Sequence, residues 1–215
     1  MKIVALTING NSILLIGGVR GLVSEGEEID SILKDFDPEI VAISMSPEEM
    51  EGLKHFLDEP FRVGLSDYDI IYGYKLAVYG EVMVPPPIFL NAVRYASQNG
   101  KRLVSLDLPE SEFSTSYTRN IGTISLIRHS LRKTRLRKKF FPDPDPDQFT
   151  ISWQNEIEKI KGFRELQQSR IDAIAVSLND LFGSCKDQRI AVIVEREIVS
   201  QIEALISVPA SQKTA

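Results

Sequence analysis

The sequence is poor in the residues that build metal sites and disulfides. Its 215 residues include one cysteine, Cys185, and two histidines, His55 and His129. A single cysteine excludes an internal disulfide and a zinc site with more than one thiolate ligand. Two histidines leave no basis for a multi-histidine metal site, and we interpret both as structural or exposed. We therefore expect no bound metal, no cofactor and a reducing, cytoplasmic location.

Long apolar runs are also missing. No stretch approaches the roughly 20 residues needed to cross a bilayer, and the first residues show no signal-peptide pattern. The formal net charge is -5, so the average surface repels nucleic acid and anionic lipid. We expect a cytoplasmic protein without a membrane partner.

The remaining pattern alternates short apolar runs with helical segments. Residues 2–8 and 12–19 predict two strands joined by a hairpin turn at Asn9-Gly10. Residues 39–45, 102–107 and 189–194 predict three more strands. Two serine–glutamate pairs have the spacing of a capping box at the start of a helix, namely Ser24 with Glu27 and Ser46 with Glu49. Further helices are expected over 66–78 and 86–99. This order predicts an α/β fold with a mostly parallel central sheet, an N-terminal antiparallel hairpin and helices on both faces.

A long helical excursion is expected over about 121–181. Apolar residues recur at helical spacing over 121–136, Asp-Pro repeats over 142–147 end that helix, and a second helical stretch is broken near Gly162. Phe140, Phe141, Phe149 and Trp153 flank the repeats, and they either pack the excursion onto the domain or mark a homodimer interface. We expect one domain over 1–207 and a flexible tail over 208–215.

Four segments in order resemble a known family. They are residues 13–24, where Gly17 is followed by Arg20; 37–44, ending in Ser44; 85–107, ending in Asp107; and 190–194, which precede Glu197. Together they resemble the TraB, Tiki, ChaN and erythromycin-esterase superfamily, and most of all its TraB (pheromone-shutdown) branch. The resemblance implies a site at the carboxyl ends of the strands, where some branches are credited with metal-dependent hydrolysis by two histidines and a glutamate.

This chain departs from the family pattern at those positions. Arg20 and Glu197 stand in place of the two histidines, and Ser44 stands in place of the glutamate, whereas Asp107 and Arg170 persist. An arginine offers no lone pair and repels divalent cations, so the resemblance implies a degenerate metal site.

We take six residues as candidates for ligand binding: Arg20, Ser44, Asp107, Arg170, Glu195 and Glu197. Three interpretations remain open for the charged ones, namely solvated surface charges, a cross-linked ion network in which Arg20 pairs with Glu197 or Asp107, and an anion-binding pocket. Asp107, Glu197 and Arg170 are the candidates for catalysis. Ser44 lacks a nucleophile elbow and a histidine base, which argues against nucleophilic catalysis.

The most concentrated charge lies between Arg128 and Lys139. We interpret this basic run as a solvated helix face, neutralised by the acids of the Asp-Pro repeats, and nucleic-acid binding as the less favoured alternative. The function expected from the whole pattern is a non-catalytic TraB-like binding or regulatory protein for a small molecule, peptide or protein. The alternative is a metal-independent hydrolase that uses carboxylates and arginine.

Overall fold

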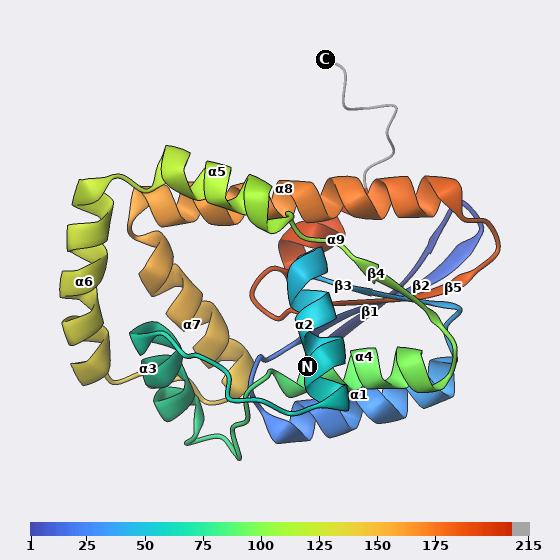
Figure 1. The fold of residues 1–215 in the computed structure, drawn as a ribbon, viewed down its shortest axis with the longest axis horizontal. Coiled ribbons are helices and arrows are strands. Elements are labelled where there is room, and N and C mark those ends of the chain that lie inside the picture. Colours follow the sequence, from blue (N-terminus) through green and yellow to red (C-terminus); the bar gives the residue numbers. More distant parts are fainter. Residues whose placement is uncertain (208–215) are drawn as a thin grey trace.

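A five-stranded sheet forms the centre of the structure, a computed structural model that describes residues 1–207 (Figure 1). The strands are β1 (Lys2–Ile8), β2 (Asn11–Gly18), β3 (Ile40–Ile43), β4 (Arg102–Ser105) and β5 (Arg189–Glu195), in the order β1-β2-β5-β3-β4. The first pair is antiparallel and the other three pairs are parallel. Asn9 and Gly10, at φ 52 and φ 82, form the predicted hairpin turn. The α/β prediction and its N-terminal hairpin are confirmed.

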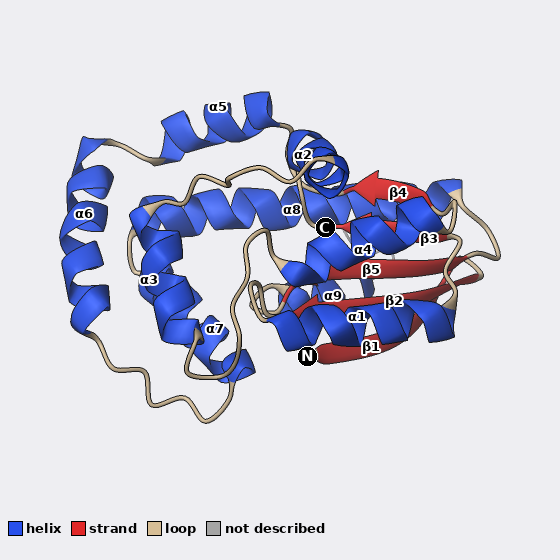
Figure 2. Cartoon of the chain, turned by 60° about the horizontal axis from the view of Figure 1, so that its bottom comes forward, coloured by secondary structure: helices blue, strands red, loops and turns tan. Residues whose placement is uncertain are grey.

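Helices cover both faces of the sheet, as predicted (Figure 2). One face packs against α1 (Val23–Phe36), α2 (Pro47–Asp58) and α4 (Pro87–Gln98), and the other against the second half of α8 (Lys161–Ser184) and α9 (Val199–Ser207). Along β5, Ile190 and Val192 face α8 and α9, while Ala191 and Ile193 face α1 and α4. A parallel strand covered on both sides needs apolar residues at every position, which explains its continuous apolar run.

The helical excursion extends from one end of the sheet. The predicted range of about 121–181 is corrected at both ends: the excursion comprises α3 (Asp67–Leu76), α5 (Glu110–Asn120), α6 (Thr123–Lys138), α7 (Pro146–Glu158) and the first half of α8, whereas the second half of α8 packs on the sheet (Figure 1). Its own core is rich in aromatic residues, because Phe141, Phe149 and Trp153 pack with tyrosines of α3. These three aromatic residues therefore hold the excursion together, and Phe140 alone of the predicted four is strongly exposed.

The predicted helix boundaries hold in most places. Ser46 forms the predicted capping box with Glu49 at the start of α2. Asp37, in the left-handed region at φ 45, ends α1. The predicted break near Gly162 separates α7 from α8. At Gly162 a Cβ would lie 2.3 Å from the backbone oxygen of Asn120, so only glycine allows α8 to approach α5 this closely. The predicted flexible tail, residues 208–215, lies outside the described residues.

One predicted cap is wrong. Ser24 does not cap α1, because the helix begins at Val23 behind Leu22, and Leu22 makes no side-chain cap. The backbone of Leu22 is extended and forms a β-bridge with Val82, which fixes where the chain can turn into the helix. The carboxylate of Glu25 accepts a hydrogen bond from the backbone N–H of Val19 at 3.0 Å instead.

The helix expected over 121–136 is confirmed as α6, but its apolar side does not face the core. Ile124, Ile127 and Leu131 are exposed, and Leu136 is the one residue of α6 that is fully buried. No helix within residues 1–207 is long and apolar enough to span a bilayer.

Candidate functional site

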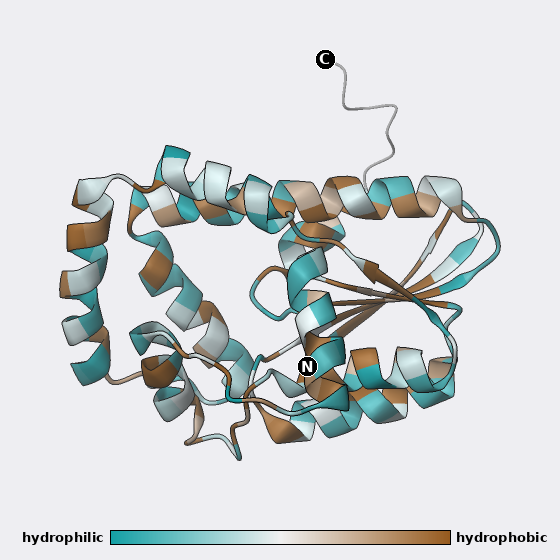
Figure 3. Cartoon of the chain, viewed as in Figure 1, coloured by the Kyte–Doolittle hydropathy of each residue, from teal (hydrophilic) through white to brown (hydrophobic). Residues whose placement is uncertain are grey.

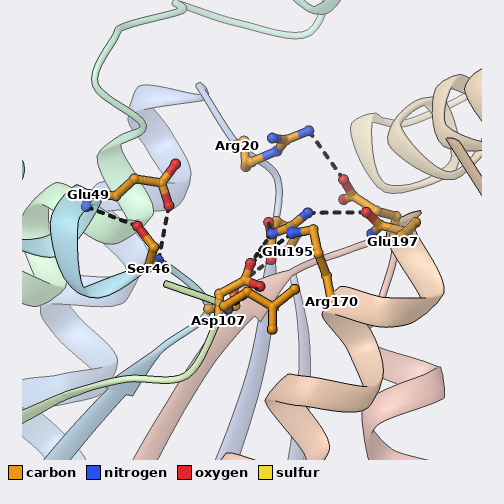
Figure 4. Close-up of polar contacts among 10 residues, drawn as sticks. Arg20, Ser46, Glu49, Asp107, Arg170, Glu195 and Glu197 are labelled. Atoms are coloured by element: carbon orange, nitrogen blue, oxygen red, sulfur yellow. Dashed lines mark hydrogen bonds and ion pairs between the residues drawn. The ribbon is translucent and has the colours of Figure 1, made fainter. Parts of the chain in front are cut away.

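Four parallel strands end at one edge of the sheet, and their carboxyl ends supply most of the predicted site. Arg20 follows β2, Ser44 follows β3, Asp107 follows β4, and Glu195 closes β5. Arg170 reaches the same edge from the middle of α8 (Figure 4). The fold therefore brings together residues as far apart in the sequence as Arg20 and Glu195.

The guanidinium of Arg170 lies at the centre of this group. Its Nε donates to Oδ2 of Asp107 at 2.7 Å, and its Nη2 donates to the same oxygen and to Oε1 of Glu195, the latter at 3.1 Å. Its Nη1 donates to Gln167 at 3.1 Å. Burial disfavours the cation, but Glu195 and Asp107 more than compensate and raise the pKa of Arg170. A permanent positive charge thus bridges two carboxylates.

The two bridged carboxylates differ in their proton affinity. Burial raises the pKa of Asp107 above its usual value despite the attraction of Arg170. Burial acts on Glu195 in the same direction, but Arg170, Arg20 and a hydrogen bond from Ser44 Oγ at 2.5 Å hold the pKa of Glu195 below its usual value. Glu195 is therefore the fixed anion of the group, and Asp107 is the carboxyl that takes up a proton more readily.

Arg20 and Glu197 form a second, looser pair. Nη2 of Arg20 lies 3.4 Å from Oε1 of Glu197, and the guanidinium lies over the ring of Tyr72 at 5.8 Å. Burial raises the pKa of Glu197. Arg20 Nε and Glu197 Oε2 are buried without a hydrogen-bond partner among residues 1–207. The predicted pairing of Arg20 with Glu197 is confirmed, and the interpretation of these residues as separate solvated charges is wrong.

A cavity of about 600 Å³ opens in front of the network. Five of the six predicted binding residues line it, namely Arg20, Ser44, Asp107, Arg170 and Glu195. Glu197, whose buried carboxylate pairs with Arg20, is not among the lining residues. A second hollow of about 670 Å³, lined in part by aromatic residues of the excursion, shares Arg20, Glu49, Pro86, Phe113 and Arg170 with the first. Both arginines thus lie where the two hollows meet.

Part of the cavity wall comes from a helix that the sequence pattern did not predict. Glu110, Phe113 and Ser114 of α5 line the cavity opposite the strand ends. None of the residues of α5 is buried, so no apolar periodicity indicates this helix. The signal that could have found it is Pro109 followed by Glu110 and Glu112, since a proline and acids favour the first turn of a helix.

The two histidines lie away from the strand ends. His55 is in the last turn of α2 and stacks on Phe61 at 5.6 Å. His129 is stacked between Tyr68, at 3.8 Å, and Phe163, at 4.2 Å. Burial, with Arg132 and Lys133 nearby, lowers the pKa of His129, so its imidazole is neutral at pH 7.

The basic run is not neutralised by the acids predicted for that role. Lys133 pairs with Asp67 at 2.5 Å, and Lys139 pairs with Glu156 at 2.6 Å. Asp147 instead binds Arg196 at 2.7 Å. The Asp-Pro segment turns from α6 into α7 and carries its carboxylates away from α6, which explains why nearness in sequence was misleading.

Among residues 1–207, no three or more His, Cys, Asp or Glu side chains are grouped so that they could hold a metal ion. A scan against protein-family models found no match for the chain, and a search of curated proteins found no significant match.

Proposed function

We propose that this chain is a non-catalytic, TraB-like binding or regulatory protein whose strand-end cavity holds a small molecule or a short peptide. The observation that carries the proposal is the position of Arg170 between Asp107 and Glu195 in the cavity wall. Both carboxylates are paired with a cation that cannot lose its proton, which disfavours ligation of a metal and activation of water by either of them.

The cavity retains the means to bind a ligand. Its wall combines charged groups with the apolar side chains of Met45, Phe89 and Phe113. Concave sites with a few converging polar groups in an apolar wall are the usual form of small-molecule sites. The partly exposed guanidinium of Arg20 stands at the junction with the second hollow, where it can donate to a carboxylate, a phosphate or a peptide carbonyl.

The experiment is a thermal-shift screen of the purified chain against Mg²⁺, Mn²⁺, Zn²⁺, nucleotides, amino acids and short peptides. Metal analysis of the same sample accompanies it. We expect an organic compound to raise the melting temperature and the metals to leave it unchanged. A stoichiometric metal, or a strong stabilisation by one of the three cations, would contradict the proposal.

A matched pair of variants on α5 ties any stabilising compound to the cavity. Ser114 lines the cavity and Ser111 lies one turn earlier on the same helix, outside the lining, and both are exposed. Ser114→Trp fills the cavity mouth, so it should abolish the shift, whereas Ser111→Trp should preserve it. Equal shifts in both variants would place the ligand elsewhere.

A metal-independent hydrolase is the second candidate, and the raised pKa of Asp107 in the cavity wall favours it. In that case Asp107 exchanges a proton with the substrate and Arg170 holds the developing anion. Hydrolysis of ester, phosphoester and peptide substrates, with Asp107→Asn as the inactive control, distinguishes the two candidates. Turnover that Asp107→Asn abolishes would replace the binding function with the hydrolytic one.

A further inference from the structure

Helix α6 presents an apolar stripe to solvent at the end of the molecule away from the sheet (Figure 3). Ile124, Ile127 and Leu131 are 71%, 56% and 70% exposed. Their spacing of three and four residues places them on one face of the helix. Leu136 and His129 point the opposite way, into the excursion. The amphipathic pattern of α6 is thus turned outward, which indicates a surface that a partner covers.

The same face is strongly basic. Seven of the chain's 25 lysines and arginines lie within residues 128–139, and residues 121–142 contain no acid. Arg128, Arg135, Arg137 and Lys138 are exposed, and none of them is paired with a carboxylate of residues 1–207. Arg128, Arg135 and Lys138 lie on the side of the helix that carries the aliphatic stripe, and Arg137 lies at the groove toward α3. All four cations can meet negative charges of a partner.

The apolar and basic character extends beyond α6. Ile70 and Tyr74 of α3 are exposed, and with Lys133, Thr134 and Arg137 they line a groove between the two helices, whose one acid, Asp67, is paired with Lys133. Phe140, which follows α6, is 80% exposed. Aromatic and aliphatic side chains among cations are typical of surfaces that enter the boundary between lipid headgroups and acyl chains.

Other occupants match only part of this surface. Nucleic acid meets the cations but offers no apolar counterpart to three adjacent aliphatic side chains. A second copy packed α6 against α6 would bring two basic runs together, and the like charges would repel. An anionic bilayer supplies negative headgroups and hydrocarbon together. We propose that α6 is a peripheral membrane-binding helix that lies in the surface of anionic membranes, with Ile124, Ile127 and Leu131 inserted.

The net charge of -5 does not oppose this contact. At physiological salt, screening limits repulsion between exposed charges to about 8 Å, so acids on distant faces act weakly. The proposed membrane contact uses a surface separate from the strand-end cavity. Its test therefore does not depend on the ligand proposed for that cavity.

The experiment is co-sedimentation of the chain with vesicles of phosphatidylcholine alone and of phosphatidylcholine with 30% phosphatidylserine. We expect the apparent affinity for the anionic vesicles to be at least tenfold higher, because headgroup attraction adds to burial of the stripe. Ile127→Glu with Leu131→Glu should reduce binding at least tenfold. Both side chains are exposed, so the fold should remain intact, as circular dichroism would verify.

Two control variants separate the stripe from general effects. Val176→Glu changes an exposed aliphatic residue of α8 and should leave vesicle binding unchanged. Replacing Arg128, Arg135, Arg137 and Lys138 with glutamine should reduce binding at least tenfold, whereas the same change at exposed Arg62, Arg119, Arg164 and Lys186 should not.

Three outcomes would overturn the proposal. One is that the chain binds the two vesicle compositions equally, or binds neither of them. Another is that the chain binds DNA but not vesicles, and that both the glutamate variant and the glutamine variant of α6 lose the binding to DNA. The third is a dimer by light scattering that Ile127→Glu with Leu131→Glu converts to a monomer, since the stripe would then be the interface between copies of the chain.

Discussion

A cluster of charged side chains lies at each edge of the parallel part of the sheet, and the two clusters have different surroundings. At the amino ends, Arg189 pairs with Asp37 and Glu39 at 3.0 Å, and all three side chains are about half exposed. At the carboxyl ends, Arg170 pairs with Asp107 and Glu195, whose side chains are 5% exposed. The bond chemistry is the same, so the comparison isolates the effect of water. Exposed pairs compete with solvent, whereas buried carboxylates depend on their partner.

The largest effect is expected at the buried end. Arg170→Met leaves two buried carboxylates without their cation and should lower the free energy of unfolding by about 3 to 5 kcal/mol at pH 7. Urea denaturation measures this loss. In the variant, burial without a cation raises the pKa of both carboxyls above their unfolded values, so the loss should shrink as pH falls toward 5. A loss below about 1 kcal/mol would show that water reaches the network.

Adding Asp107→Asn and Glu195→Gln to Arg170→Met provides the control. The triple variant has no unpaired charge at the strand ends and should recover part of the lost stability. If the triple variant is as unstable as Arg170→Met alone, packing of the arginine side chain and not charge pairing explains the loss.

An intermediate effect is expected at Glu156, a buried carboxylate whose partners Lys139 and Lys159 are partly exposed. Burial raises its pKa, but hydrogen bonds and attraction from both lysines lower it to about 2. The folded pKa lies below the unfolded one, so the pairing stabilises the protein above about pH 4.5 and is lost as pH falls from there toward 2.

Glu156→Gln should therefore cost about 1 kcal/mol at pH 7 and only a small fraction of that near pH 2. Thermal unfolding of both proteins across that pH range measures the difference. A difference that does not change with pH would mean that Glu156 acts through packing and not through its charge.

The smallest effect is expected at the exposed end. Arg189→Met should cost about 0.5 kcal/mol or less, and 1 M salt should reduce even that. Urea denaturation at two salt concentrations measures it. A cost comparable to that of Arg170→Met would remove the contrast between the two ends of the sheet.

The sheet was predictable because its strands are continuous apolar runs separated by turn residues. β5 needs no tertiary information to be recognised, since a run such as 190–194 can only be buried. The excursion was less predictable. The pattern of α6 gives the helix but not which way its apolar face points, because that depends on packing with α3, α7 and α8. α5 has no buried residue and leaves no periodic signal.

The site was predictable to a similar degree. Residues that follow parallel strands must share an edge of the sheet, which placed Arg20, Ser44, Asp107 and Glu195 together. The sequence could not show that Arg170, and not Arg20, is the central cation, because that depends on where α8 crosses the strand ends. The resemblance to the TraB branch stays a prediction.

Helix α8 has one further consequence for the site. It is a single helix of 24 residues, about 36 Å long, with its first half in the excursion and its second half on the sheet. Its first turn is set by the close approach of Gly162 to Asn120, and Arg170 lies about 12 Å farther along the axis. A shift of α5 at that contact would change the tilt of α8. It would thereby alter the distances from the guanidinium of Arg170 to the carboxylates of Asp107 and Glu195.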